Sequence, residues 1–164
     1  MFKTLIILAC FVGIAFAAVS NAADVWIHST SQSALPLGAV YGGYNSDGSP
    51  LYVGRAYHDG NLLPAKVSPS RGLAHVANYG KEHKKTTFDV LVGEGYSWVP
   101  DNYGHVPATA VIGGKKKNGE ILYIGRAMYK NSLVIGKIDQ SHGCLYIPFG
   151  GKEVAIRQYE VLVR

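Results

Sequence analysis

The sequence is poor in cysteine and in charge, and it lacks the periodicity of amphipathic helices. It has two cysteines in 164 residues, and 16% of its residues are charged against 48% hydrophobic ones. Such low charge excludes a charge-rich disordered chain and a coiled coil. No window shows a helical apolar period with capping residues at its ends. The length suits a single domain with a hydrophobic core of its own.

The first residues have the pattern of a secretory signal peptide. Lys3 precedes an apolar run over 5–19, and Ser20-Asn21-Ala22 forms a small-x-small cleavage signal. A retained membrane anchor is the alternative, but the run is shorter than the roughly 20 residues that a membrane span needs. We therefore expect a signal peptide over 1–22, no membrane span, and a secreted, extracellular protein.

The most informative feature is an internal repeat. Residues 36–92 align without a gap with residues 107–163, and 21 of these 57 positions are identical. Unrelated segments would share only about three or four, since two residues of average composition match at roughly 6%. The sequence therefore predicts two tandem repeats, 23–93 (the first copy) and 94–164 (the second copy). Two copies of this length favour one compact unit with pseudo-two-fold symmetry over a solenoid.

Each copy has the pattern of antiparallel strands. Asp47-Gly48 in the first copy and Asn118-Gly119 in the second lie between apolar runs. These dipeptides are the strongest short hairpin signals, because both residues tolerate positive φ. The segments 88–92 and 159–163 contain an acidic residue between apolar ones, and they predict one further strand in each copy. The fold class expected is all-β.

Motifs for enzymatic chemistry and for cofactors are absent from the sequence. The glycine pairs at 42–43 and 113–114 are not followed by a phosphate-binding motif, so no nucleotide cofactor is expected. The six histidines have no metal-ligand spacing, and we expect no metal site. The lysine clusters 81–85 and 115–117 are interpreted as solvated loops rather than as a nucleic-acid surface. We therefore expect a protein that is not an enzyme and needs no cofactor.

Two arginines occupy the same position in both copies. Arg55 and Arg126 each follow a Tyr-Val/Ile-Gly step in an apolar segment. An unpaired buried charge is costly, so each arginine needs a partner. The repeated Glu82 and Glu153 are the candidates, and a ligand contact is the alternative.

Other repeated charges have two interpretations. Asp89 and Glu160 alternate with apolar residues, which predicts that they face solvent. Lys66 and Lys137 fit either a lysine that extends along an edge strand towards water or a ligand contact.

Cys144 is the only cysteine that remains after the predicted cleavage. It is either a buried free thiol or a bridge between chains. His142 lies two residues earlier and would share its face on a strand, as a base beside a thiol nucleophile. The first copy has Leu73 at the corresponding position, which favours packing over catalysis.

One loop has the composition of a sugar-binding site. The hairpin loop 44–47 places hydrogen-bonding side chains beside Tyr41 and Tyr52. Sugar hydroxyls donate and accept hydrogen bonds, and sugar C–H faces pack on aromatic rings. The corresponding loop 115–118 is basic, so the two loops are not equivalent.

The sequence resembles the tandem DM-nine repeat proteins of invertebrates. The resemblance covers residues 26–163 and is specific, because many motifs occur in the same order twice. The motifs that carry it are Trp26, 35–40, Asp47-Gly48, 51–56, 63–67, 80–82 and 88–92, with their second-copy counterparts. The resemblance implies a compact pair of intertwined antiparallel β-sheets. Members of this family act as mannose-binding lectins in innate immunity and often form dimers, and natterin-like proteins combine the repeats with a pore-forming module.

The resemblance also implies which residues contact sugar. In the family's lectins these are an acid after the Gly-Gly/aromatic step and the lysine of the Pro-x-Lys motif. The matching residues are Asn45 and Lys66, and Lys116 and Lys137. Lys116 cannot accept a hydrogen bond, which makes an anionic glycan a candidate ligand of the second copy. The predicted carbohydrate-binding residues are Asn45, Asp47, Lys66, Lys116, Asn118 and Lys137.

We therefore expect a secreted lectin-like protein that recognises mannose-type or anionic microbial glycans, with a homodimer as a possible assembly. The alternative is an extracellular interaction or structural protein whose sugar site has decayed.

Overall fold

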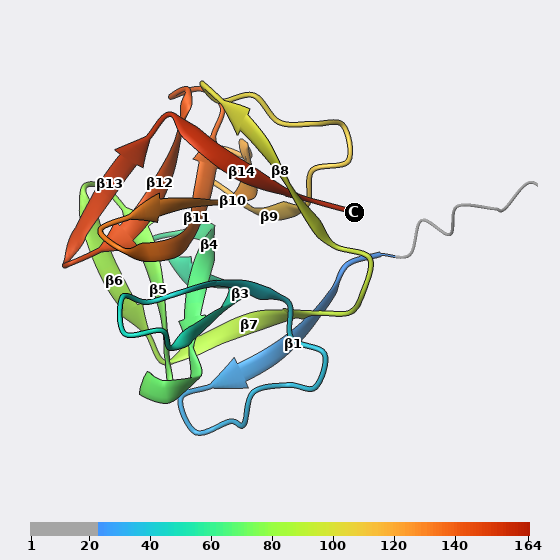
Figure 1. Cartoon of the computed structure of the whole chain (residues 1–164), viewed down its shortest axis with the longest axis vertical. Helices are drawn as coiled ribbons and strands as arrows, with labels where there is room; N and C mark the ends of the chain where they lie inside the picture. The colour runs from blue at the N-terminus through green and yellow to red at the C-terminus, as the bar shows by residue number, and fades with distance from the viewer. Residues whose placement is uncertain (1–22) are drawn as a thin grey trace, which may run out of the picture.

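The computed structural model describes residues 23–164, which form an almost purely β structure (Figure 1). The predicted signal peptide lies outside these residues. The first copy contains β1 (Val25–Thr30), β2 (Tyr41–Tyr44), β3 (Pro50–His58), β4 (Asn61–Ser68), the 3₁₀ turn η1 (Pro69–Arg71), β5 (Leu73–Asn78), β6 (Lys81–Lys85) and β7 (Thr87–Val92). The second contains β8 (Ser97–Asn102), β9 (Ile112–Lys115), β10 (Ile121–Tyr129), β11 (Ser132–Asp139), β12 (Cys144–Phe149), β13 (Lys152–Ile156) and β14 (Gln158–Val163). Within these residues, no helix has the length and apolar character to cross a membrane.

The strands follow the sequence repeat. Strands β2 to β7 each have a counterpart that begins 71 residues later, from β9 to β14, and β1 and β8 are offset by 72. The sheet order is β1-β7-β3-β2-β11-β12-β13-β6-β5-β4-β9-β10-β14-β8. Exchanging each strand for its counterpart gives the same order in reverse, so a pseudo-two-fold axis passes between β6 and β13. The predicted all-β fold of intertwined, symmetric repeats is confirmed.

The copies are intertwined through β2 and β9. Strand β2 pairs with β11 of the second copy, and β9 pairs with β4 of the first. A Cβ atom on Gly43 would lie 2.0 Å from the carbonyl oxygen of Leu133, and one on Gly114 would lie 2.0 Å from that of Leu62. No side chain fits at either crossing. The repeated glycine pairs therefore permit close strand contact and do not indicate a nucleotide site.

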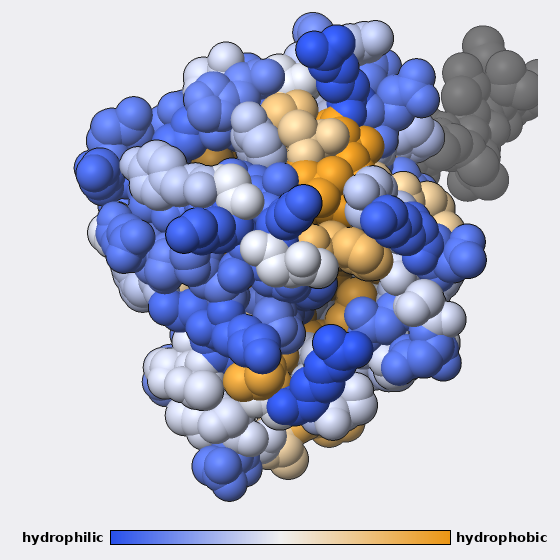
Figure 2. All heavy atoms as spheres, turned by 90° about the vertical axis from the view of Figure 1, so that its left-hand side faces the viewer, coloured by the Kyte–Doolittle hydropathy of each residue, from blue (hydrophilic) through white to orange (hydrophobic). Residues whose placement is uncertain are grey.

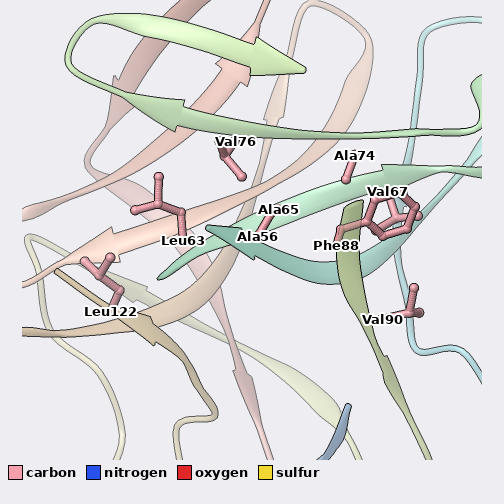
Figure 3. Close-up of a cluster of buried hydrophobic side chains, with 9 residues drawn as sticks. All are labelled: Ala56, Leu63, Ala65, Val67, Ala74, Val76, Phe88, Val90 and Leu122. Atoms are coloured by element: carbon pink, nitrogen blue, oxygen red, sulfur yellow. The ribbon is translucent and has the colours of Figure 1, made fainter. Parts of the chain in front are cut away.

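Two of the three hydrophobic clusters belong mainly to one copy each, and the third joins the copies. Figure 3 shows the first-copy cluster, whose members are Ala56, Leu63, Ala65, Val67, Ala74, Val76, Phe88, Val90 and Leu122. The joint cluster contains Leu51, Val53 and Leu91 with Ile124 and Leu162. Each of these five side chains is fully buried, and such burial stabilises by about 1.5–3 kcal/mol per residue. Because each copy contributes, neither completes its core alone.

The face that carries β6 and β13 is mostly hydrophilic and is crossed by an apolar band (Figure 2). Lys81 and Lys84 of β6 and Lys152 of β13 are exposed.

Each repeated arginine is held between a tryptophan and an acid. The Arg55 guanidinium lies 4.2 Å from the centre of the Trp26 ring, and its Nε donates to Asp89 Oδ2 at 3.0 Å. In the second copy, Arg126 contacts Trp98 and Glu160 in the same way, at 4.3 Å and 2.7 Å. The predicted pairing of the arginines with Glu82 and Glu153 is therefore wrong. The acids predicted to face solvent are the partners, because β7 and β14 lie directly beside β3 and β10.

Candidate functional site

The repeated lysines and glutamates meet at the pseudo-two-fold axis. Lys66 Nζ lies 2.9 Å from Glu82 Oε1, and Lys137 Nζ lies 2.9 Å from Glu153 Oε1. Both lysines are buried, with 7% and 6% exposure. Strand β4 is paired on both sides, so the alternative of a lysine on an edge strand is wrong.

Each glutamate also binds the backbone of the other copy. Glu82 Oε2 accepts from the Gly151 N–H at 2.7 Å, and Glu153 Oε2 accepts from the Gly80 N–H at 2.6 Å. Burial alone would raise the pKa of Glu82, but the Gly151 N–H and the Lys66 ammonium outweigh it and leave this pKa below its usual value. Burial lowers the pKa of Lys66 despite Glu82. These contacts join the copies at the axis.

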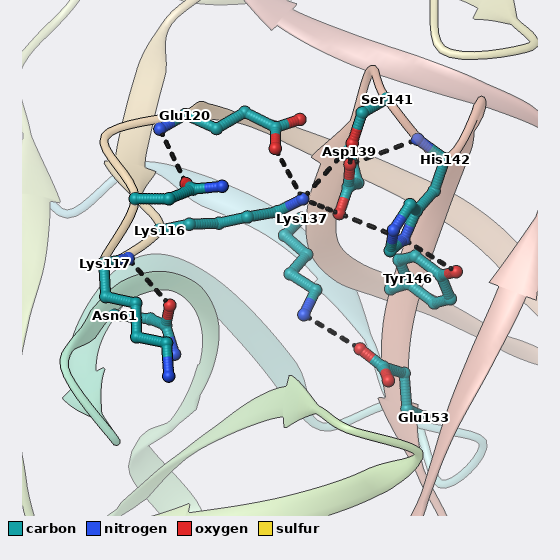
Figure 4. Close-up of polar contacts among 11 residues, drawn as sticks. Asn61, Lys116, Lys117, Glu120, Lys137, Asp139, Ser141, His142, Tyr146 and Glu153 are labelled. Atoms are coloured by element: carbon teal, nitrogen blue, oxygen red, sulfur yellow. Dashed lines mark hydrogen bonds and ion pairs between the residues drawn. The ribbon is translucent and has the colours of Figure 1, made fainter.

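Above the second lysine is a cavity of about 230 Å³, here called the second-copy cavity. The first copy contributes the start of β4 and the β5–β6 turn. The second copy contributes the β9–β10 loop and strands β11 to β13. Its lining residues are Asn61, Leu63, Asn78, Tyr79, Lys116, Lys137, Asp139, His142, Tyr146 and Glu153. Figure 4 shows Lys116 extending across it towards Asp139, while Lys137 points towards Glu153.

The charge of Lys116 is neutralised within the protein. Its Nζ lies 2.8 Å from Asp139 Oδ2, 2.8 Å from Glu120 Oε2 and 3.3 Å from Ser141 Oγ. Burial opposes protonation, but the two carboxylates outweigh it and raise the pKa of Lys116. Burial would likewise raise the pKa of Asp139, but Lys116 and Ser141 lower it. Three acceptors surround the three N–H groups of Lys116, so this residue forms a wall of the cavity and is not an open cation.

The groups still able to bind a ligand lie deeper and on the rim. Glu153 and the Tyr146 ring are the contacts of the Lys137 ammonium in the described residues, which leaves N–H groups able to donate. Asn78 is 5% exposed, and its Nδ2 has no hydrogen-bond partner within 23–164. Tyr79 stands on the rim and is 74% exposed. Donors, a carboxylate and aromatic rings therefore border one space.

The corresponding region of the first copy differs. Phe149, the counterpart of Asn78, lies with its ring 5.7 Å from Lys66 Nζ, and Lys66 donates to the Pro148 carbonyl at 2.6 Å. The Asn45 side chain donates to Ser49 Oγ, and no interaction between Asn45 and Lys66 occurs in the described residues.

Two of the six predicted residues, Lys116 and Lys137, line the second-copy cavity. Asp47 accepts from the Ser49 N–H at 2.9 Å, and Asn118 accepts from the Glu120 N–H at 3.0 Å, so both shape their hairpin turns. Neither is among the lining residues of this cavity.

Sequence reasoning did not assign the other eight lining residues to a sugar site, among them Asn78, Tyr79 and Asp139. The counterparts of these three are Phe149, Gly150 and Ser68. The alignment of the two copies could have indicated these residues, because at each of these positions the two copies differ strongly in side-chain chemistry.

His142 and Cys144 do not share a strand. His142 lies in the turn before β12, and its Nδ1 is 3.3 Å from Asp139 Oδ2. Cys144 is a buried free thiol whose pKa is raised by burial. Over 23–164, no group of three metal-binding side chains gathers.

The comparisons with known proteins agree with this architecture. The DM9 repeat model matches residues 17–60 and 45–156. A search of curated proteins finds no match. A crystal structure of the nematode sperm cell motility protein MFP2B matches with a TM-score of 0.67 and 13% identity, over 94% of this chain and 51% of that one. The chain thus spans about half the length of that protein, and at this identity the likeness shows the fold alone. Since the family model covers most of the sequence, and the structure has the expected tandem symmetry, the chain belongs to the DM9 repeat family.

Proposed function

We propose that the protein is a secreted carbohydrate-binding protein without enzymatic activity, and that one sugar residue of a microbial, mannose-type glycan binds in the second-copy cavity. The family membership supports a lectin role, as in the family's mannose-binding members that act in innate immunity. The volume of about 230 Å³ is below the roughly 300–1,000 Å³ of sites for drug-sized ligands, which suits a single ring.

The backbone conformation and exposure of Tyr79 are the main support for the proposal. Its φ is +46°, in the left-handed region that a bulky residue rarely adopts, and its counterpart Gly150 has φ +60°. Glycine would fit this turn more easily, yet a tyrosine stands here with its ring exposed on the cavity rim. Sugar C–H faces pack on such rings. A role in binding accounts for an aromatic residue in this conformation.

The deeper polar groups suit neutral hydroxyls. Lys137 and Asn78 provide N–H donors, and Glu153 provides a carboxylate beside them. Hydroxyl groups both donate and accept, so they fit such a mixed set. Lys116 and Lys137 are each paired with a carboxylate. This pairing favours a neutral sugar over an anionic glycan in this cavity.

The test combines a glycan array with calorimetry of methyl α-mannoside on the mature protein. Tyr79→Gly inserts the counterpart residue and removes the ring without demanding a strained backbone. We expect about two- to tenfold weaker binding, the range of an aromatic contact, with unchanged or higher thermal stability. Asn78→Phe inserts the residue of the counterpart position, Phe149, into the cavity and should abolish binding.

Asn45→Ala is the matched control, because Asn45 is the counterpart of Lys116 and lies at the other loop. It should leave binding unchanged. Loss of binding in Asn45→Ala together with normal binding in Tyr79→Gly and Asn78→Phe would place the sugar in the first copy. That result would contradict the second-copy assignment.

The second candidate function is an extracellular interaction or structural protein. The saturation of Lys116 by its own neighbours favours it, because a decayed sugar site would be filled by such internal contacts. A folded protein that binds no glycan on the array would support this function instead.

A further inference from the structure

A second cavity lies in the first copy, on the other side of β4. Its volume is about 230 Å³, and its lining residues are His28, Arg55, Ala56, Tyr57, Leu62, Lys85, Thr87, Phe88 and Asp89. It shares no residue with the second-copy cavity, whose lining includes Asn61 and Leu63. Because neighbouring residues of a strand point to opposite faces, Leu62 on one side and Asn61 and Leu63 on the other separate the two spaces.

The side chains that line this cavity carry more positive than negative charge. Asp89 is its one carboxylate, and both of its oxygens are engaged, one by Arg55 Nε at 3.0 Å and one by His28 Nδ1 at 3.1 Å. The Lys85 side chain has no ion-pair or hydrogen-bond partner among residues 23–164. Its ammonium and the terminal guanidinium nitrogens of Arg55 therefore have N–H groups to offer.

The second copy shows that this arrangement is not demanded by the fold. There, Arg126 Nη1 donates to the Gly42 carbonyl at 3.3 Å, a bond that has no first-copy counterpart in the described chain. The positions of Lys85 and Thr87 are taken by Ile156 and Gln158. The repeated arginine is therefore held in place in the second copy without a lysine or a threonine at these positions. Lys85 and Thr87 are additional polar groups in the cavity of the first copy.

We propose that this cavity binds the oxyanion of a phosphate or sulfate ester. Arginine and lysine bind such oxygens through charge-assisted hydrogen bonds, and the Thr87 hydroxyl adds another possible donor. Ala56, Leu62 and Phe88 give the cavity an apolar part that suits the organic body of an ester. The site is separate from the proposed sugar site, and its test uses different variants.

Trp26 provides the readout, because the Arg55 guanidinium lies 4.2 Å from its ring centre. The sequence has two tryptophans, so Trp98→Phe leaves Trp26 as the only indole fluorophore. Titrations of this variant with glucose 6-phosphate and with inorganic phosphate, at constant ionic strength, should change its fluorescence saturably. Glucose and chloride should not. Tighter binding of glucose 6-phosphate identifies the ester as the occupant, and equal affinities identify the free ion.

Two further substitutions, made in the Trp98→Phe background, decide whether the effect is local. Lys85→Ile inserts the second-copy residue at a partly exposed position and should weaken binding of both probes by about three- to tenfold, as for the loss of one hydrogen bond of ordinary net strength. Lys81→Ile removes an equal charge from an exposed position on the same strand and should have little effect. An absent response, or equal weakening by the two variants, would overturn the proposal.

Discussion

The two copies are almost the same at the pseudo-two-fold axis and different at their cavities. At the axis, each lysine pairs with its glutamate at 2.9 Å, and each glutamate binds a glycine N–H of the other copy. Above the axis, one copy has Asn45 and Ser68 where the other has the pair Lys116–Asp139. The comparison separates charges that hold the fold together from charges that give each copy its own surface.

The largest expected effect comes from breaking the shared part. Glu82→Gln and Glu153→Gln each leave a buried lysine without its counter-charge, in pairs whose side chains are 9–12% exposed or 8–9% exposed. Breaking a buried pair costs about 3–5 kcal/mol, and the retained amide lowers this to about 2–4 kcal/mol. Urea unfolding should show similar losses in both variants.

Glu94→Gln, at an exposed position of the segment between the copies, is the control and should change stability little. If one axis variant lost several kcal/mol and its counterpart less than about 1 kcal/mol, the symmetric role of these pairs would be disproved.

An intermediate effect is expected where the copies differ. Lys116→Asn and Asp139→Ser each insert the first-copy residue, and together they remove the whole pair. Each single change leaves a charged group with fewer partners, so the double variant should be more stable than the sum of the single losses predicts. A coupling of about 1–2 kcal/mol is expected for groups in direct contact. Chemical denaturation of the four proteins measures it.

The reciprocal cycle in the first copy sharpens this test. Asn45→Lys with Ser68→Asp should build the same pair and show coupling of the same sign. Strictly additive losses in the second-copy cycle would mean that Lys116 and Asp139 do not support each other.

The sequence predicted the strands well because the strand and turn signals are local. Asp47-Gly48 and Asn118-Gly119 do form hairpin turns, and the segment 88–92 lies in β7. The ion pairs depend instead on which strands become neighbours. Arg55 lies opposite Asp89 because β7 pairs with β3, and alternation along one strand cannot reveal that pairing.

The candidate site was harder to predict because it is built from both copies. Asn78 and Tyr79 come from the β5–β6 turn of the first copy, while Asp139 ends β11 of the second. The second copy alone contains the ion pairs Lys116–Asp139 and Lys137–Glu153, but it lacks the part of the cavity wall that the first copy supplies. The exchange of β2 and β9 between the copies, which brings these elements together, follows from tertiary packing rather than from any local motif.

The smallest expected effect concerns pH. His75 is buried in the first copy, and Tyr146 takes its place in the second. Burial lowers the pKa of His75, with Lys66 and Arg71 adding to the decrease and Glu82 opposing it. Burial and the neighbouring His83 also lower the pKa of His58. Below the ordinary histidine pKa of about 6.5, the unfolded chain therefore binds more protons than the folded one.

Stability should accordingly be complete above about pH 6.5 and should fall as the pH drops towards 5, at no more than about 1.4 kcal/mol per pH unit for each histidine. His75→Tyr gives the first copy the second-copy residue and should make this dependence shallower, with His58 responsible for the remainder. His105→Gln, at an exposed position, should leave the slope unchanged. Urea midpoints between pH 7.5 and 5 measure the slope, and a His75→Tyr profile as steep as that of the unaltered protein would show that the buried histidine does not distinguish the copies in acid.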